Sequence, residues 1–286
     1  MHLSNSELIL NPDGSIYHLC LQKDQVAPLI ITVGDQDRVG EVSKHFDRID
    51  SKVQKREFTT HTGELNDKRI TVISTGIGTD NIDIVFNELD ALFNIDFESR
   101  TINEDFQELQ FIRIGTSGVL QLDIDVDTFL ISEYAIGMDA LIHYYQYNYS
   151  KEEQYLNDAF QIHIGRQFPS YVAKGSTGLM QKFDADFIKG ITITAPGFYA
   201  PQGRALRLKT KEEDFISSMQ SFNLNNRRIT NLEMETSGIY GLANLLGHQA
   251  VSCNALLANR ANGIFSKNPK KTVEDLITKT LETICS

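Results

Sequence analysis

Two arginines of the sequence stand beside glycine-rich stretches. Arg38 follows Gly34, and Arg113 lies a few residues before Gly115 and the hydroxyl of Thr116. A guanidinium, a small hydroxyl and backbone N–H groups that glycine leaves accessible form a typical binding set for phosphate. Arg113 lies between apolar residues, so we expect its charge to be buried and to need a partner. Each glycine taken singly is more simply a turn residue, and a single surface arginine is more simply a solvated charge.

A pair of carboxylates follows later in the chain. Glu233 and Glu235 are separated by Met234, so they lie on the same side of an extended segment. Such a pair can transfer protons or hold the hydroxyl groups of a sugar. The competing interpretation is that the two charges complement the positive end of the helix expected after them.

A third stretch, from Phe198 to Arg204, contains an aromatic ring, the amide of Gln202 and a guanidinium. This set suits a heterocyclic base, which stacks on the ring and exchanges hydrogen bonds with the amide and the cation. The simpler alternative is an ordinary turn. The sequence shows no Ser-His-Asp or Cys-His nucleophile, and its seven histidines lack metal-ligand spacing, so we predict no metal site.

Composition narrows the class of protein. The 286 residues include 27 Lys and Arg against 38 Asp and Glu, which gives a net charge of −11. Without a basic stripe, such a chain repels nucleic acids and anionic membranes, so neither is an expected partner. Three widely spaced cysteines suggest neither disulfides nor zinc, and the sequence shows no signal peptide or membrane span. We therefore expect a soluble cytoplasmic protein.

Apolar patterns predict the elements that position these residues. Strand-like and helix-like segments alternate, which is typical of an α/β fold in layers around a mixed sheet. The glycine-rich stretches fall at predicted strand ends, where ligands gather in open α/β folds. We predict strands at 29–33, 53–61, 69–75, 111–114, 128–133, 191–195 and 250–257, and helices at 38–46, 82–93, 239–246 and 272–284.

Four local details accompany this prediction. Residues 115–118 are expected to form a turn after their strand, and Thr79 or Asp80 is expected to cap the helix at 82–93. Gly247 suits a left-handed residue that ends a helix. The Tyr-rich segment 144–155 is expected to be a loop or an interface arm.

Seven motifs together resemble those of uridine phosphorylases, which belong to the nucleoside phosphorylase superfamily. They occur in the family's order and approximate spacing, from about residue 17 to residue 260. The resemblance implies one three-layer α/β/α domain over residues 1–286, with a central mixed sheet. The motifs are Gly34-Asp35-Gln36-Asp37-Arg38-Val39, Arg56-Glu57-Phe58, Ser74 to Gly78, Arg113 to Gly118, Phe198 to Arg204, Glu233-Met234-Glu235 and Asn259-Arg260.

The resemblance also implies residue roles. Arg113, Arg204 and Glu235 are implied as catalytic, with Arg56 and His18 supplied by a neighbouring subunit. Phosphate-binding residues are Gly34, Arg38, Arg56, Arg113 and Thr116; ribose-binding residues are His18, Met234 and Glu235; base-binding residues are Phe198, Gln202 and Arg204, with Arg260 behind the base pocket.

The implied activity is phosphorolysis of uridine to uracil and ribose 1-phosphate in nucleoside salvage, which makes the protein a pentosyltransferase. Inorganic phosphate is the co-substrate and no cofactor is required. The implied assembly is a homo-oligomer, a dimer or a hexamer, with shared active sites. A monovalent cation between subunits stays open, because Thr79-Asp80-Asn81 replaces the stretch near which some relatives bind one. The alternatives are a purine nucleoside phosphorylase, a nucleosidase, or a non-catalytic nucleoside-binding or storage protein on the same fold.

Overall fold

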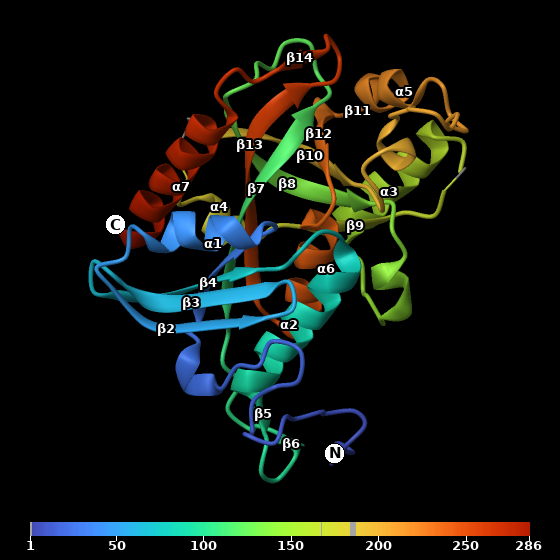
Figure 1. Cartoon of the computed structure of the whole chain (residues 1–286). Coiled ribbons are helices and arrows are strands. Elements are labelled where there is room, and N and C mark those ends of the chain that lie inside the picture. Colours follow the sequence, from blue (N-terminus) through green and yellow to red (C-terminus); the bar gives the residue numbers. More distant parts are fainter. Residues whose placement is uncertain (1, 167, 184–186) are drawn as a thin grey trace.

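The computed structural model describes residues 2–166, 168–183 and 187–286, and Figure 1 shows its elements. The strands are β1 Leu29–Val33, β2 Arg48–Lys55, β3 Phe58–Leu65, β4 Lys68–Ser74, β5 Ile95–Asp96, β6 Thr101–Ile102, β7 Gln110–Val119, β8 Phe129–Gly137, β9 Tyr171–Lys174, β10 Phe187–Thr194, β11 Asn223–Leu224, β12 Arg227–Glu233, β13 Gln249–Asn259 and β14 Ile264–Phe265. The α-helices are α1 Gln36–Ser43, α2 Thr79–Asn94, α3 Lys151–His163, α4 Thr177–Met180, α5 Phe215–Ser221, α6 Thr236–Leu246 and α7 Pro269–Cys285. Short 3-10 helices cover Lys23–Gln25, Leu141–Tyr144 and Ala200–Gln202.

One large mixed sheet forms the centre of the molecule. Its strand order is β11-β12-β10-β8-β13-β7-β1-β4-β3-β2, with β9 paired to β8 and β14 paired to β13. The pairs β1–β4, β1–β7, β7–β13, β8–β10 and β10–β12 are parallel, whereas β8 and β13 are antiparallel. An additional antiparallel pairing joins β12 to β7. It closes β7, β13, β8, β10 and β12 into a ring of strands.

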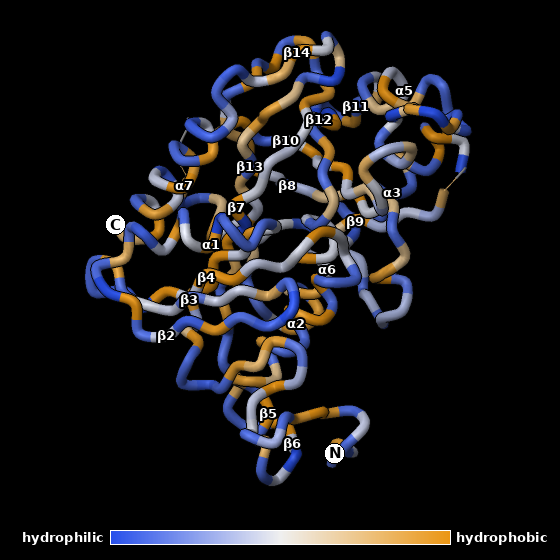
Figure 2. Tube along the Cα trace, in the orientation of Figure 1, coloured by the Kyte–Doolittle hydropathy of each residue, from blue (hydrophilic) through white to orange (hydrophobic). Residues whose placement is uncertain are grey.

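Helices cover both faces of the sheet, so the predicted three-layer α/β/α fold is confirmed. Successive strand residues point to opposite faces. Ile30 packs in the cluster that contains Phe86 of α2 and Tyr240 of α6. Its neighbour Ile31 packs in the cluster that contains Val39 of α1 and residues of α7. In Figure 2 the tubes of α2 and α7 alternate between hydrophobic and hydrophilic colours, as expected for helices with one buried face.

Helix α2 matches the prediction, but its cap does not. The residue before its first turn is Gly78, with a φ of 98°, whereas Thr79 already belongs to the helix. Neither Thr79 nor Asp80 is therefore the N-cap. This backbone conformation, with a ψ of 160°, is one that favours glycine, and the Gly78 N–H donates to the carboxylate of Glu235 at 2.9 Å.

The strand predicted at 53–61 is wrong, because a hairpin turn interrupts it. Lys55 pairs with Phe58, which leaves Arg56 and Glu57 as the two turn residues between β2 and β3. Arg56 has a φ of 55°, a left-handed conformation that a strand does not contain.

Two further predictions need correction. Residues 115–118 continue strand β7 instead of forming a turn. The Tyr-rich segment 144–155 is only partly a loop, because α3 begins at Lys151 after a capping box made by Ser150 and Glu153. Gly247, with a φ of 79°, ends α6 as predicted.

Some features are absent from the described part of the chain. None of its helices has both the length and the apolar character needed to cross a membrane. Its His, Cys, Asp and Glu side chains form no group of three or more that suits a metal ion. The three cysteines, Cys20, Cys253 and Cys285, are unpaired.

Candidate active site

A cleft of about 720 Å³ opens where the carboxyl ends of the central parallel strands meet. Its walls come from the turns after β1 and β4, from β7, from the loop after β10 and from the β12–α6 junction. This is the position where open α/β sheets bind ligands. Nine predicted site residues line it, namely Gly34, Arg38, Arg113, Thr116, Phe198, Gln202, Arg204, Met234 and Glu235.

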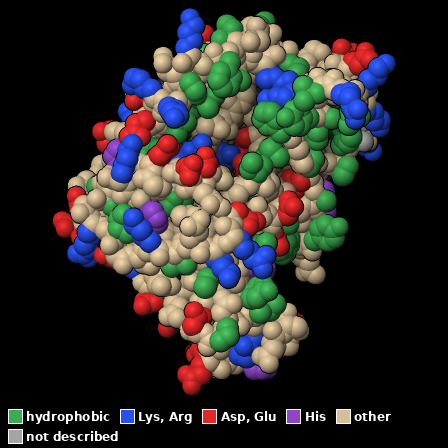
Figure 3. Space-filling model, viewed as in Figure 1, with side chains coloured by type: hydrophobic (Ala, Val, Ile, Leu, Met, Phe, Trp, Pro, Cys, Tyr) green, Lys and Arg blue, Asp and Glu red, His purple; other side chains and the backbone are tan. Residues whose placement is uncertain are grey.

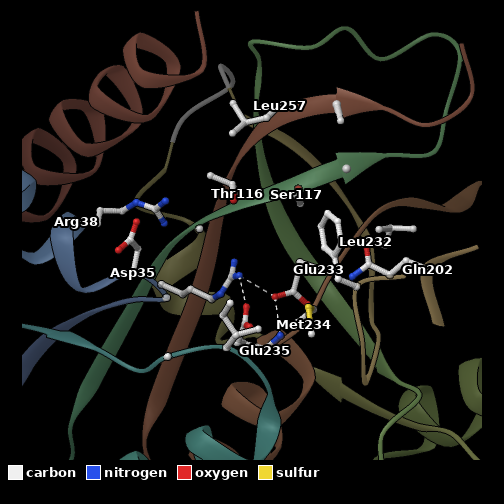
Figure 4. A pocket seen from close by; sticks show the side chains of 18 of the residues that line it. Asp35, Arg38, Thr116, Ser117, Gln202, Leu232, Glu233, Met234, Glu235 and Leu257 are labelled. Atoms are coloured by element: carbon white, nitrogen blue, oxygen red, sulfur yellow. Dashed lines mark hydrogen bonds and ion pairs between the residues drawn. The ribbon is translucent and has the colours of Figure 1, made fainter. Parts of the chain in front are cut away.

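Arg113 is buried in the floor of the cleft between two carboxylates, so the partner that its apolar flanks predicted is present. Its Nη2 lies 2.7 Å from Glu235 Oε2 and 3.0 Å from Glu233 Oε2. Its Nη1 donates to Asn254 Oδ1 at 2.9 Å. The dashed lines of Figure 4 show the cluster below Thr116.

The strand closure between β12 and β7 creates this cluster. Leu232 pairs with Gly118 in an antiparallel register. The residues after Leu232 therefore run back along β7 toward Arg113. Gly115 is needed here for space, because a Cβ at this position would overlap the guanidinium of Arg113. The glycine that suggested a turn in the sequence is a strand residue that makes room for a side chain.

Glu233 holds the junction between β12 and α6. Its carboxylate accepts hydrogen bonds from the backbone N–H of Glu235 at 2.9 Å and of Thr236 at 3.0 Å, and from Thr194 Oγ1 at 2.7 Å. With Arg113 as a fourth partner, the hydrogen-bonding capacity of this buried carboxylate is taken up within the protein. The carboxylate of Glu235, which also lines the cleft, accepts from the Gly78 N–H and from Arg113.

The charges of the cluster shift one another. Burial alone lowers the pKa of Arg113, but Glu233 and Glu235 together raise it above its ordinary value. Burial raises the pKa of Glu235; the negative charge of Glu233 adds to this effect, and Arg113 opposes it. Two carboxylates thus share one permanent cation away from water.

One end of the cleft carries a buried arginine whose hydrogen bonds are incomplete within the described residues. Arg38 lies there on the first turn of α1, next to Asp35, and Figure 4 shows both on the side of the cleft away from Gln202. Its Nη1 contacts the Ile114 carbonyl at 3.4 Å, and its buried Nε finds no hydrogen-bond acceptor within the described residues. Burial lowers the pKa of Arg38, and the nearby Arg113 cation adds to the effect. An anion bound between Gly34, Arg38 and Thr116 would supply the missing acceptor and charge.

The other end has hydrogen-bonding groups and an aromatic ring. Arg204 Nη1 donates to Gln202 Oε1 at 2.6 Å and to the Phe198 carbonyl at 2.8 Å. Its guanidinium lies 3.8 Å from the centre of the Phe198 ring, so it covers one face of that ring. Burial lowers the pKa of Arg204 to about 10, with a further contribution from Arg260. Arg260 donates to the Gln202 carbonyl at 3.0 Å.

The rim at this end is apolar and exposed. Phe198 and Phe265 both line the cleft, with 51% and 61% of their surfaces exposed. Figure 3 shows hydrophobic atoms gathered on the side of α5, while basic and acidic side chains are mixed over the rest of this face.

Two predicted site residues do not reach this cleft. Arg56 is exposed on the β2–β3 turn, where its carbonyl accepts from Gln36 Nε2 at 3.2 Å. His18 lies on the segment before β1, and its Nδ1 is 2.6 Å from Glu88 Oε1. Neither residue is among those that line the cleft.

Comparison with known proteins supplies the family. A model described as the phosphorylase superfamily matches residues 28–285. The chain belongs to this superfamily. The predicted resemblance is therefore confirmed at the family level, over the α/β body that carries the cleft.

Relatives and solved structures agree with this membership. The chain is similar to a uridine phosphorylase of Thermococcus kodakarensis, with 28% identity over 259 residues, 91% of this chain and 83% of the relative. A uridine phosphorylase of Haemophilus influenzae is 27% identical over 86% of this chain and 87% of its own length. A Trypanosoma brucei nucleoside phosphorylase, described as showing uridine phosphorylase activity, has a TM-score of 0.87 and 29% identity, and the match covers 96% of this chain and 99% of that one.

The sequence did not reveal the roles of two residues near Arg113, Glu233 and Asn254. Glu233 was recognised as one of two carboxylates, but not as the group that fixes both Arg113 and the start of α6. Asn254 of β13 also escaped notice, although it binds the same arginine. The signal for Glu233 was its alternation with Glu235. For Asn254 only the three-dimensional pairing of β13 with β7 reveals the contact.

Arg113→Met tests whether this arginine neutralises the two carboxylates. We expect the free energy of unfolding to fall by about 3–5 kcal/mol near neutral pH, because the variant leaves buried charges unpaired. The loss should grow as the pH rises above the ordinary pKa of the glutamate, 4.5. Without the arginine, the folded-state pKa of Glu235 rises further above its ordinary 4.5, and stability is lost as the pH rises through that folded value.

Urea unfolding of both proteins at each pH measures the effect. Arg228→Met is the control, because the side chains of its ion pair with Asp123 are 37% and 62% exposed and such a pair contributes about 0–1 kcal/mol. Equal losses for the two variants would contradict the assigned role of Arg113.

Proposed function

We propose that this protein is a uridine phosphorylase, which converts uridine and phosphate into uracil and ribose 1-phosphate in nucleoside salvage. The observation that carries the proposal is the order of groups along one cleft. Arg38 and Gln202 lie at opposite ends, with the carboxylate of Glu235 between them, and we assign the Arg38 end to the phosphate and the Gln202 end to the base. Two of the relatives named above are uridine phosphorylases, and the third is described as showing uridine phosphorylase activity.

The phosphate end supplies the nucleophile. A phosphate held by Arg38, the hydroxyl of Thr116 and the backbone at Gly34 attacks C1′ of the ribose, while the bond from C1′ to N1 of uracil breaks. The sugar passes through a cationic, oxocarbenium-like state. No covalent enzyme intermediate is needed, so catalysis consists of positioning and charge stabilisation.

Glu235 acts on the sugar. Its Oε1 accepts from the Gly78 N–H at 2.9 Å and its Oε2 from Arg113 at 2.7 Å, which fixes the carboxylate at both oxygens. The remaining lone pairs can accept the 2′- and 3′-hydroxyls, and the negative charge faces the cationic sugar. Met234 packs beside it against the ribose.

Gln202 and Arg204 act on the leaving base. Since Gln202 Oε1 already accepts from Arg204, its amide nitrogen is oriented to donate to a carbonyl oxygen of uracil. Arg204 stabilises the negative charge that develops on the uracil as the bond breaks. Phe198 offers the ring face that Arg204 does not cover.

The proposed site is completed by a second subunit. His18 and Arg56 do not line the cleft of their own chain, and we assign them to the ribose 5′-hydroxyl and the phosphate in the cleft of a neighbouring subunit. A two-fold dimer lets each chain complete the other. We further propose one phosphorylase-like domain over residues 1–286, with inorganic phosphate as the co-substrate and no required cofactor. We also propose a cytoplasmic location, which the unpaired cysteines support.

The anion site distinguishes this proposal from the alternatives. A nucleosidase attacks the sugar with water, so it has no need of the anion site at Arg38. A storage protein has no need of a carboxylate fixed between that end and the base. The groups at the base end are an amide and a guanidinium, which suit the carbonyl oxygens of a pyrimidine.

The decisive assay follows release of free base from uridine, thymidine, inosine and adenosine, with and without phosphate. We expect rapid release of uracil from uridine only when phosphate is present, together with one ribose 1-phosphate per uracil. Equal rates without phosphate would identify a nucleosidase instead. Faster release from inosine would identify a purine enzyme.

Arg204→Ala tests the base end. We expect kcat/KM for uridine to fall by about 100-fold or more, because the developing charge on uracil loses its cation. Arg207→Ala, an exposed arginine three residues along the same loop, is the matched control and should change kcat/KM little. If both variants behave alike, Arg204 has no special role at the base.

Subunit complementation tests the shared site. Arg56→Ala and Glu235→Ala should each be inactive alone, whereas mixing and subunit exchange should restore about a quarter of the natural activity. About half of the dimers are then hybrids, and each hybrid has one intact site out of two. Absence of rescue after exchange has been verified by mass spectrometry would show that each subunit works alone.

A further inference from the structure

Glu88 of α2 binds His18 in a manner that fixes the imidazole ring. Glu88 Oε1 lies 2.6 Å from His18 Nδ1. The same carboxylate accepts the backbone N–H groups of His18 at 3.0 Å and Leu19 at 2.9 Å. Tyr17 packs its ring edge-on against the imidazole, with 4.7 Å between the ring centres. The histidine is therefore held through its backbone, one ring nitrogen and a roughly perpendicular aromatic neighbour.

These contacts select one tautomer of the neutral imidazole ring. With Nδ1–H donating to a carboxylate, the neutral imidazole carries its second nitrogen, Nε2, as an acceptor. The His18 side chain is 31% exposed, whereas that of Glu88 is 12% exposed. The pair thus presents an oriented acceptor at the surface, supported by a nearly buried anion.

The position on α2 shows that this acceptor does not serve its own cleft. Ile77 and Asn81, at the start of the helix, line the cleft. Glu88 follows Asn81 by seven residues, which is two helical turns or roughly 10 Å along the axis, on the same helix face. His18 therefore lies beyond the end of its own cleft, on the side where α2 continues.

We infer that Glu88 is a positioning residue that orients His18 Nε2 toward the ribose 5′-hydroxyl in the cleft of a neighbouring subunit. The inference rests on the proposed function and adds a residue to it. Glu88 touches no substrate. It acts through the tautomer and the orientation of His18, as carboxylates do for other functional histidines.

A purely structural role predicts something different. If Glu88 only ties the segment around Leu19 to α2, its loss weakens the fold and lowers activity on every substrate alike. If it acts through His18, its loss affects only substrates that carry a 5′-hydroxyl. A comparison of uridine with 5′-deoxyuridine separates the two roles.

The experiment measures kcat/KM for both substrates in His18→Ala, Glu88→Ala, Glu88→Gln and the double variant of His18→Ala with Glu88→Gln. We expect the preference for uridine over 5′-deoxyuridine to fall about 10-fold in His18→Ala and Glu88→Ala, the effect of losing one oriented hydrogen bond. Glu88→Gln keeps an oxygen for the backbone N–H groups and should still lower the preference at least about 3-fold. The double variant should match His18→Ala. Glu98→Gln, an exposed glutamate at the β5–β6 turn, is the charge-matched control.

Three outcomes would overturn the inference. One is an equal loss on both substrates in the Glu88 variants, and another is an unchanged preference in them. The third is a further fall when Glu88→Gln is added to His18→Ala. A natural protein that releases uracil from neither substrate would instead refute the proposed function itself.

Discussion

The sharing of one buried arginine by two carboxylates is the constraint on which the cleft depends. Each charge removed from water costs several kcal/mol, so the cluster is stable only because every charge has close partners. Arg113 bridges Glu233 and Glu235, and Asn254 and the backbone N–H groups at the start of α6 take up further contacts. Those partners come from β7, β13 and the β12–α6 junction. The cluster therefore exists only when β12 closes onto β7.

The same cluster limits which groups are available to bind phosphate in the proposed function. Because Arg113 Nη2 contacts both carboxylates and Nη1 contacts Asn254, much of its hydrogen-bonding capacity is used inside the protein. Its role is then mainly to set the position of Glu235 and to offset its charge. In the proposed function, the phosphate dianion is therefore bound chiefly by Arg38, by the backbone at Gly34 and by a cation from a neighbouring subunit. This explains why a chain with a well-formed cleft would still need a second copy of itself.

The sequence predicted what depends on local pattern. The apolar flanks of Arg113 predicted a buried charge with a partner. The alternation of Glu233 and Glu235 predicted two carboxylates on the same side of an extended segment. It could not predict the β12–β7 pairing, because strands more than 100 residues apart leave no local signal. For the same reason Gly115 was interpreted as a turn residue, although it makes room for the Arg113 guanidinium. Arg56 was placed in a strand because the two-residue turn at Arg56 and Glu57 contains no glycine, proline, asparagine or aspartate to signal it.

Helix α2 connects the two halves of the proposed shared site. At its start, the Gly78 N–H fixes Glu235, the proposed contact to the ribose in the chain's own cleft. Two turns past the cleft edge, Glu88 fixes His18, the proposed contact to the ribose of a neighbour. The helix packs through Phe86 against Phe111 of β7, with 4.1 Å between ring centres, so it is anchored to the strand that carries Arg113. The separation between the two proposed ribose contacts of one chain is therefore set by a single anchored helix. In a two-fold dimer, that fixed separation determines how the two clefts must face each other for both to be complete.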